Sequence, residues 1–260
     1  MPDASNHRPA ESMIIRERAI VTSGLRRAPG KLETVLRLHP GMALLFDMDG
    51  VIIHSTPLHN RAWEVYLSRH GIDPGDIGRR MHGKRNDQIV RDYFGAALDP
   101  AEVHEHGAAK ERLYRRMMGP VISQWIVPGV REFIADCEPA PKAVASNAET
   151  PNIVFVLEGA GLTSSFDAIV DGNQVDNPKP SPEVYLKAAE LIGVDPGNCV
   201  VFEDSLAGVE AGLAAGARVV GLTTSLDELP GVEFHIKDFH DARLRPWIEQ
   251  LKPRRSGRVW

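Results

Sequence analysis

Two carboxylates lie close together at the end of an apolar stretch of the chain. The run ALLF at residues 43–46 leads directly into Asp47, Met48, Asp49 and Gly50. Like charges beside a buried edge are unfavourable unless a cation or a reaction requires them. A carboxylate that attacks phosphorus divides phosphoryl transfer into two easier steps, so Asp47 is the candidate nucleophile. If the extended geometry persists, Asp49 lies on the same side and can act as general acid and base.

Polar side chains also follow three later apolar stretches. They are Ser146 and Asn147 after KAVA, Glu203 with Asp204 after CVVF, and Lys179, which follows DNP just beyond the stretch AIVD at 168–171. Mg²⁺ prefers carboxylate oxygens, while a hydroxyl and an ammonium can hold phosphoryl oxygens as charge develops in a transition state. This combination predicts magnesium-dependent phosphoryl transfer, provided that the fold brings the four stretches together.

The apolar stretches predict buried parallel strands. Each is near-continuously apolar rather than alternating, as expected of strands covered on both faces. Helical patterns separate the later ones, which is typical of an α/β domain with a mainly parallel sheet. Ligand sites in such sheets lie at the carboxyl ends of the strands, where these polar side chains stand. The expected strands are 43–47, 142–146, 168–171, 199–204 and 218–222.

One interval interrupts the alternation of strand and helix. From Pro57 to about Val121 only helical patterns occur, which predicts a helical insert directly after the first strand. The connections on both sides carry Pro, Gly and Ser, the residues expected of hinges. The expected division is a weakly ordered extension over 1–40, an α/β catalytic core over 41–55 and 123–245, a helical cap over 56–122 and a solvated tail over 246–260.

Composition narrows the classes of function. Hydrophobic residues make up 43% of the 260 residues, the net charge is −5 and the pI is about 6.1, so neither nucleic acid nor an anionic membrane is expected as a partner. No apolar run approaches the roughly 20 residues of a bilayer span, and the N-terminal residues lack the apolar region of a signal peptide. Two cysteines are too few for a disulfide framework or a zinc site. We expect a cytoplasmic protein with reduced thiols.

Taken together, four stretches resemble the signature motifs of the haloacid dehalogenase-like superfamily. They are DMDG at 47–50, Ser146 after its strand, NPKPSPEVY around Lys179, and FEDSLAGVEAGLAAGA from residue 202. Their order and spacing resemble the branch of beta-phosphoglucomutase and phosphoglycolate phosphatase over about residues 41–230. The resemblance implies a Rossmann-like parallel sheet core with an inserted helical cap domain.

The resemblance also implies a role for each of these residues. Asp47 is the expected nucleophile and Asp49 the acid and base. Ser146 and Lys179 are expected to bind phosphate, with Asn147 beside them. Mg²⁺ is expected to be held by Asp47, the backbone carbonyl of Asp49 and Asp204, with Glu203 close by.

Three cap residues resemble substrate-binding positions of beta-phosphoglucomutase. In the mutase, a histidine and a lysine at the positions of His59 and Lys110 help to handle the sugar phosphate, and an arginine in a cap loop, here Arg85, grips a second phosphate. Other interpretations of the same residues are a histidine on a helix surface and a solvated arginine in a loop.

Phosphatases are the commoner outcome among proteins of this branch. We therefore expect a Mg²⁺-dependent phosphatase of a small phosphorylated metabolite, a sugar phosphate, working through an aspartyl-phosphate as a monomer or small homo-oligomer. The alternative is a phosphosugar mutase of the beta-phosphoglucomutase type, which must protect the aspartyl-phosphate from water until the intermediate turns round.

Non-enzyme alternatives are a catalytically inactive binding module and a phospho-receiver domain. Every motif residue is present, which disfavours the first, and receiver domains are shorter and have no helical insert. A calcium loop is a further interpretation of D-x-D-G, but the third acid and the later Glu of that pattern are missing.

Overall fold

The computed structural model describes residues 35–81 and 84–254 of the chain, and within them six strands form one parallel sheet. The strand order is β3-β2-β1-β4-β5-β6, and every neighbouring pair is parallel. The strands are β1 (Ala43–Phe46), β2 (Lys142–Ala145), β3 (Ala168–Val170), β4 (Cys199–Glu203), β5 (Arg218–Leu222) and β6 (Phe234–Ile236).

The structure confirms the predicted α/β class and the five predicted strands. The sixth strand, β6, was not predicted from the sequence. All residues of β1 to β5 are buried, which explains their continuous apolar runs. Only Ile236 of β6 is buried, since this strand closes the edge of the sheet. Its sequence, FHI, is therefore too short and too mixed to be recognised by apolar character.

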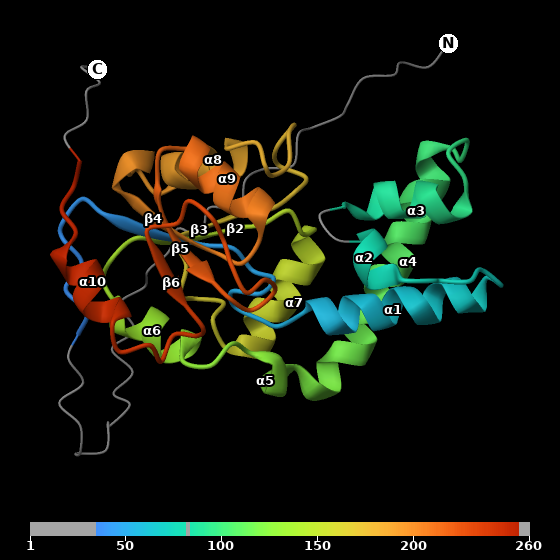
Figure 1. Cartoon of the computed structure of the whole chain (residues 1–260), viewed down its shortest axis with the longest axis horizontal. Helices are drawn as coiled ribbons and strands as arrows, with labels where there is room; N and C mark the ends of the chain where they lie inside the picture. The colour runs from blue at the N-terminus through green and yellow to red at the C-terminus, as the bar shows by residue number, and fades with distance from the viewer. Residues whose placement is uncertain (1–34, 82–83, 255–260) are drawn as a thin grey trace, which may run out of the picture.

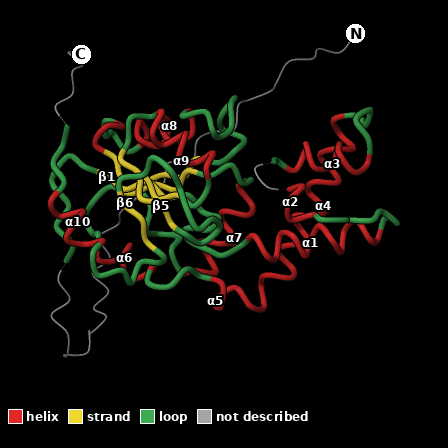
Figure 2. The backbone as a smooth tube through the Cα atoms, in the orientation of Figure 1, coloured by secondary structure: helices red, strands yellow, loops and turns green. Residues whose placement is uncertain are grey.

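Helices cover both faces of the sheet (Figure 2). Leu44 and Phe46 of β1 belong to the apolar cluster on one face, and Ala43 and Leu45 to the cluster on the other. The first face carries α6 (Val130–Asp136), α7 (Thr150–Ala160) and α10 (Leu244–Gln250), and the second carries α8 (Glu183–Leu191) and α9 (Leu206–Ala214).

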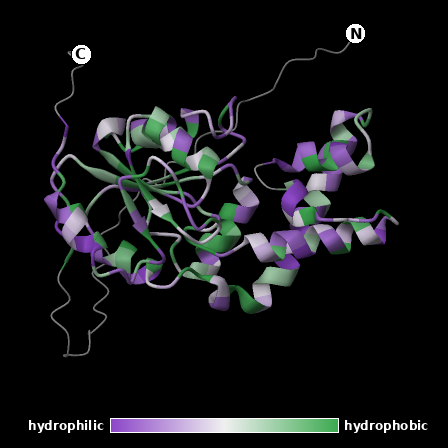
Figure 3. Ribbon diagram, in the orientation of Figure 1, coloured by the Kyte–Doolittle hydropathy of each residue, from purple (hydrophilic) through white to green (hydrophobic). Residues whose placement is uncertain are grey.

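In Figure 3 the hydrophobic colouring marks strands at the centre of the core, while hydrophilic colouring is prominent on α10. Aromatic packing reinforces the middle of the sheet. Phe46 and Phe202 are register partners on β1 and β4, and their rings stack with centroids 4.7 Å apart. Such stacking adds to the free energy gained from burying the two rings.

The expected helical insert lies between β1 and β2, beside the core (Figure 1). Asp99 caps the longest of its helices by accepting hydrogen bonds from the backbone N–H groups of Ala101 and Glu102. We call α1 to α4 the cap; the exact bounds of the domains stay a prediction. The inserted elements are α1 (Thr56–Arg69), α2 (Ile77–Met81), α3 (Asn86–Phe94), α4 (Pro100–Met118) and a short return through 3₁₀ helix Gly119–Val121 and α5 (Ile122–Trp125).

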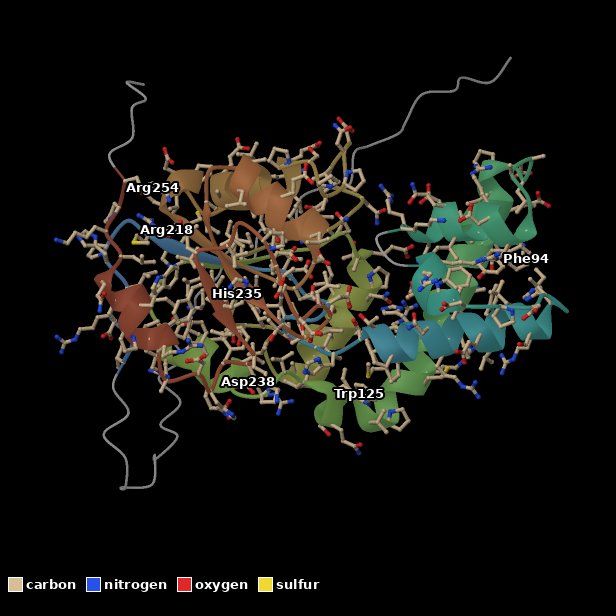
Figure 4. The ribbon with its side chains drawn as sticks, viewed as in Figure 1. Phe94, Trp125, Arg218, His235, Asp238 and Arg254 are labelled. Carbon is tan, nitrogen blue, oxygen red and sulfur yellow. The ribbon has the colours of Figure 1, made fainter. Side chains whose placement is uncertain are left out.

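The two connections between core and cap lie side by side. The backbone N–H of His54 donates to the carbonyl of Trp125 over 2.7 Å, and Ile53 forms an isolated bridge with Ile126. The outgoing and returning chains are therefore hydrogen-bonded to each other where they leave the sheet. Trp125 lies at the end of α5 in Figure 4.

Most of the expected N-terminal extension, and the last six residues of the tail, lie outside the described residues. Leu36 is described and is buried, and its N–H donates to the carbonyl of Asp136 at 3.0 Å. This part of the expected extension therefore packs on the core. In the described parts of the chain no helix combines the length and the apolar character that a membrane span requires.

Candidate active site

Lys179 joins the carboxyl ends of three neighbouring strands. Its Nζ donates to Asp47 Oδ1 and Glu203 Oε1, each over 2.6 Å, and to the carbonyl of Ala145 over 3.0 Å. These acceptors follow or end β1, β4 and β2, which are neighbours in the sheet. The parallel topology thus explains how residues from distant parts of the sequence meet at one edge.

The buried ammonium of Lys179 is held in its charged form. Burial by itself favours the neutral amine, but Asp47 and Glu203 outweigh burial and raise the pKa of Lys179 above its ordinary value. The site therefore keeps a fixed positive charge at one position.

Ser146 and Asn147 form the turn that follows β2. Ser146 is buried, and its Oγ accepts a hydrogen bond from the N–H of Ala148 over 3.1 Å. Asn147 Oδ1 accepts from the backbone N–H of Lys179 over 3.2 Å, so this turn is tied to the loop that carries the lysine. The structure thus places both residues in the neighbourhood of Asp47.

Three buried carboxylates lie close enough together to hold one metal ion. Asp47, Glu203 and Asp204 each offer an oxygen, and these oxygens lie within 4.8 Å of one another. Burial, followed by repulsion from Glu203, raises the pKa of Asp204 to about 7. Burial also raises the pKa of Asp47, although Lys179 opposes the shift. A divalent cation would offset this surplus of negative charge, so the donor set fits Mg²⁺.

The acidic cluster leaves no room for a side chain at Gly50. A Cβ on Gly50 would lie 1.7 Å from Asp204 Oδ2, and the residue has a positive φ of 76°. Both observations require glycine. The turn after β1 therefore brings the backbone directly against the carboxylate that follows β4.

Glu203 is surrounded by donors. Its Oε1 accepts from Lys179 and, over 2.7 Å, from the hydroxyl of Tyr185, while its Oε2 accepts from the N–H groups of Asp204 and Ser205 and from the Ser205 hydroxyl. Glu203 thus holds Lys179, Tyr185 and Ser205 in fixed positions, besides contributing negative charge.

Sequence reasoning missed Tyr185 and two hydroxyls from the loop after β5. Ser225 and Thr224 donate to Asp204 Oδ2, and Thr224 also donates to the carbonyl of Gly50 over 2.7 Å. Tyr185 stands in the quoted PEVY stretch, which was a usable signal. The TTS stretch at 223–225 offered a weaker one, its position just after an apolar run.

Asp49 is an expected Mg²⁺ ligand through its backbone carbonyl, and its carboxylate is not one of the three that lie close enough together to hold one ion. Its Oδ1 accepts from the hydroxyl of Ser55 and lies 3.9 Å from Nε2 of His59, which belongs to the cap. Burial raises the pKa of Asp49 to about 6, although the Ser55 hydrogen bond works against the shift. The side chain is therefore placed between the core and the cap and can hold a proton near neutral pH.

His59 and Lys110 meet on the cap. Lys110 Nζ donates to His59 Nδ1 over 2.8 Å, so the remaining ring proton lies on Nε2, the nitrogen nearer Asp49. Burial and then the charge of Lys110 lower the pKa of His59 to about 3, which keeps the ring neutral. The ring also stacks on Tyr114 with centroids 3.7 Å apart.

Arg85 does not join this pair among the described residues. It stands at the start of α3, is exposed, and its Nε lies 3.6 Å from Asp87. The next residue, Asn86, is the one that reaches the cap cluster, by donating to Glu111 over 2.7 Å.

A family model and a similar protein both relate this chain to hydrolases. Residues 42–216 match the family model described as haloacid dehalogenase-like hydrolase. Hexitol phosphatase A of Escherichia coli is 31% identical over 185 residues, covering 70% of this chain and 83% of that protein.

A second relative is much longer than this chain. Protein SUPPRESSOR OF QUENCHING 1, chloroplastic, of Arabidopsis thaliana is 34% identical over 195 residues, which are 72% of this chain but only 18% of that protein.

Among solved structures, beta-phosphoglucomutase from Clostridium difficile has a TM-score of 0.70 at 24% identity, and the match covers 80% of this chain and 96% of that one. That likeness shows a shared fold.

Proposed function

This chain belongs to the haloacid dehalogenase-like hydrolases, and on that premise we propose that it is a Mg²⁺-dependent phosphatase of a small sugar phosphate. The observation that carries the proposal is the position of Asp47. It follows the central strand β1, is hydrogen-bonded to Lys179, and lies within the three-acid cluster. The proposed nucleophile, an ammonium group and three carboxylates suited to a metal ion thus lie together at the carboxyl ends of the strands.

In the proposed mechanism Asp47 attacks the phosphorus of the substrate. The new bond from the carboxylate oxygen to phosphorus forms as the ester bond breaks, and Asp49 gives its proton to the leaving oxygen. Asp49 then accepts a proton from water, whose oxygen attacks the aspartyl-phosphate, so inorganic phosphate leaves and Asp47 is restored. The raised pKa of Asp49 suits a group that must hold and release a proton near neutral pH.

The other residues bind and neutralise the phosphoryl group. Lys179 and the Ser146 hydroxyl are proposed to hold the phosphoryl oxygens. Asn147 positions the lysine by accepting a hydrogen bond from the backbone N–H of Lys179. Mg²⁺, held by Asp47, Asp204 and neighbouring groups, would supply positive charge against the phosphoryl oxygens.

The cap pair His59 and Lys110 is proposed to recognise the sugar. The Nε2–H of His59 and the ammonium of Lys110 are donors suited to hydroxyl and phosphate oxygens, and His59 Nε2 lies 3.9 Å from Asp49 Oδ1. Hexitol phosphatase A is a relative named for this kind of substrate. Arg85 is proposed as a further contact to substrate from the loop before α3.

A phosphosugar mutase is the second candidate, favoured by the His59–Lys110 pair next to Asp49. In a mutase the same aspartyl-phosphate would return its phosphoryl group to a second hydroxyl of the sugar, and water would have to be excluded meanwhile.

Phosphate release from a panel of hexose and hexitol phosphates with Mg²⁺ tests both candidates. Beta-glucose 1-phosphate with a trace of the 1,6-bisphosphate is run beside it. Release from several monoesters supports the phosphatase, whereas glucose 6-phosphate with little free phosphate replaces it by the mutase. No turnover of any ester would reject both candidates.

A further inference from the structure

Glu111 is a buried carboxylate that the proposed mechanism does not use. It lies on α4 next to Lys110, and only 3% of its surface is exposed. Its Oε1 accepts from Lys110 Nζ over 2.8 Å and from Asn86 Nδ2 over 2.7 Å. Its Oε2 accepts from Asn152 Nδ2 over 2.7 Å. A carboxylate with this many donors is held in one orientation.

Asn152 brings the core into this cluster. It lies in the first turn of α7, the core helix that faces the cap (Figure 1), and only 2% of its surface is exposed. Its Oδ1 accepts from Arg115 NH1, so the amide cannot turn over without placing its NH₂ group against the guanidinium. Arg115 thereby directs Nδ2 of Asn152 towards Glu111.

The cluster joins three helices through one carboxylate. Asn86 begins α3, Lys110 and Glu111 lie on α4, and Asn152 belongs to α7. The helix α7 starts only a few residues after Ser146, whose turn is part of the proposed phosphate site. The cluster therefore joins the cap to the helix that follows that turn.

The charges in the cluster balance. Burial opposes ionisation of Glu111, but the charge of Lys110 and the hydrogen bonds from Lys110 and Asn86 outweigh it and hold the pKa of Glu111 well below its ordinary value. Glu111 in turn fixes Lys110, whose Nζ lies between Glu111 Oε1 and His59 Nδ1 at 2.8 Å from each. Displacing Glu111 would therefore displace the lysine and with it the histidine.

We propose that Glu111 and Asn152 are positioning residues for the His59–Lys110 pair. Asn152 of the core holds Glu111 of the cap, and Glu111 holds Lys110, so that sugar recognition by the cap is aligned with the phosphate site. The proposal rests on the proposed function in assigning sugar recognition to that pair. Neither residue touches the substrate; each acts through Lys110.

Two isosteric single substitutions break the hydrogen bond between core and cap. In Asn152→Asp two carboxylates face each other across the bond. In Glu111→Gln two NH₂ groups do, because Lys110 and Asn86 hold the Gln oxygen on their side and Arg115 prevents the amide of Asn152 from turning over. The double variant Glu111→Gln with Asn152→Asp restores the bond in reverse, with Gln donating and Asp accepting. The matched control is Asn198→Asp. Asn198 Oδ1 accepts from the backbone N–H of Arg254, which lies on the opposite side of the molecule from Phe94 of the cap (Figure 4).

The readout is selectivity, taken as kcat/KM for a hexitol phosphate divided by kcat/KM for p-nitrophenyl phosphate. The aryl ester has no sugar hydroxyl for the cap pair to bind. Each single variant should lower the ratio at least about tenfold, as for the loss of a hydrogen bond to a charged group. The double variant should recover it to within about threefold of wild type. Singles that keep the wild-type ratio, or a double variant as poor as the singles, would overturn the proposal whatever the melting temperatures.

Hydrogen exchange of the α3 backbone amides provides a readout that needs no activity. Exchange should be faster in both singles than in wild type and should return to the wild-type rate in the double variant. Unchanged exchange in the singles would contradict the proposal. Should the wild-type protein release phosphate from no ester, the proposed function alone is rejected and the exchange measurement decides the positioning role.

Discussion

Two of the buried lysines in this molecule show how differently the core and the cap use the same side chain. Lys179 in the core lies among three described carboxylates that can approach one ion, so negative charge is in surplus there. Lys110 in the cap lies between one carboxylate and a neutral histidine, so charge there is balanced. Surplus negative charge favours the binding of a cation, and that cation together with Lys179 can bind a phosphoryl group. A balanced cluster instead holds its own side chains in place. The comparison separates chemistry in the core from positioning in the cap.

The largest effect is expected at Asp47. The Asp47→Asn variant should lose phosphate release by roughly 10³-fold or more, because an amide cannot form the aspartyl-phosphate. The measurement is phosphate release at saturating Mg²⁺, with circular dichroism to show that the fold is kept. Glu210→Gln, an acid-to-amide change on an exposed position of α9, is the control and should keep wild-type turnover. Substantial release by Asp47→Asn would assign the nucleophile elsewhere.

Removal of Mg²⁺ should act on the core and leave the cap unaffected. Chelation should lower turnover at least about 100-fold, reversibly, because the metal offsets charge at the phosphoryl group. Adding Mg²⁺ at about 100 times its dissociation constant should stabilise the folded chain by about 2.7 kcal/mol. Thermal unfolding with and without Mg²⁺ measures this, and Asp204→Asn should weaken the response. An equal Mg²⁺ response in Asp204→Asn would remove Asp204 from the ligand set.

The core site could be predicted from the sequence because parallel strands end at one edge. Asp47, Lys179 and Glu203 each follow or end an apolar run or lie in a loop beside one, and strand pairing brings them together without further information. Tyr185 was missed because its approach to Glu203 depends on how α8 packs, which no short pattern encodes.

The cap was harder to predict because its contacts depend on helix orientation. Glu111 follows Lys110 directly, and neighbouring residues on a helix point in different directions, so nothing local indicated that the two side chains meet. The partner Asn152 comes from another helix, 41 positions later. Arg85 was predicted at the substrate site from a resemblance in the loop, yet its contact among the described residues is Asp87.

Replacement of each lysine by methionine sharpens the contrast. Lys179→Met should lower kcat by roughly 10²- to 10³-fold, because a donor to the transition state is lost. Lys110→Met should lower kcat/KM for a hexitol phosphate by roughly 10- to 100-fold and destabilise the fold by about 3–5 kcal/mol, since Glu111 loses its counter-charge. Lys142→Met, at a third buried lysine near Glu138, is the control for loss of a buried ammonium. Similar kinetic losses in all three variants would erase the distinction between the two sites.

The smallest effect, and the one that separates the two regions by its sign, is the dependence of stability on pH in the absence of Mg²⁺. Burial and Lys110 lower the pKa of His59 from 6.5 to about 3, so its contribution to stability is present above pH 6.5 and is lost as the pH falls towards 3. Burial and Glu203 raise the pKa of Asp204 from 3.8 to about 7, so its contribution is present at acid pH and is lost as the pH rises through 7. Urea unfolding with chelator at pH 5 and pH 7 measures both contributions.

His59→Gln should reduce the loss of stability on acidification by about 2 kcal/mol, and Asp204→Asn should increase that loss by a similar amount. Changes of the same sign in the two variants would mean that core and cap do not differ in charge balance. A surplus of buried carboxylates makes the folded state bind a proton more readily than the unfolded chain does, whereas the buried histidine beside Lys110 binds a proton less readily.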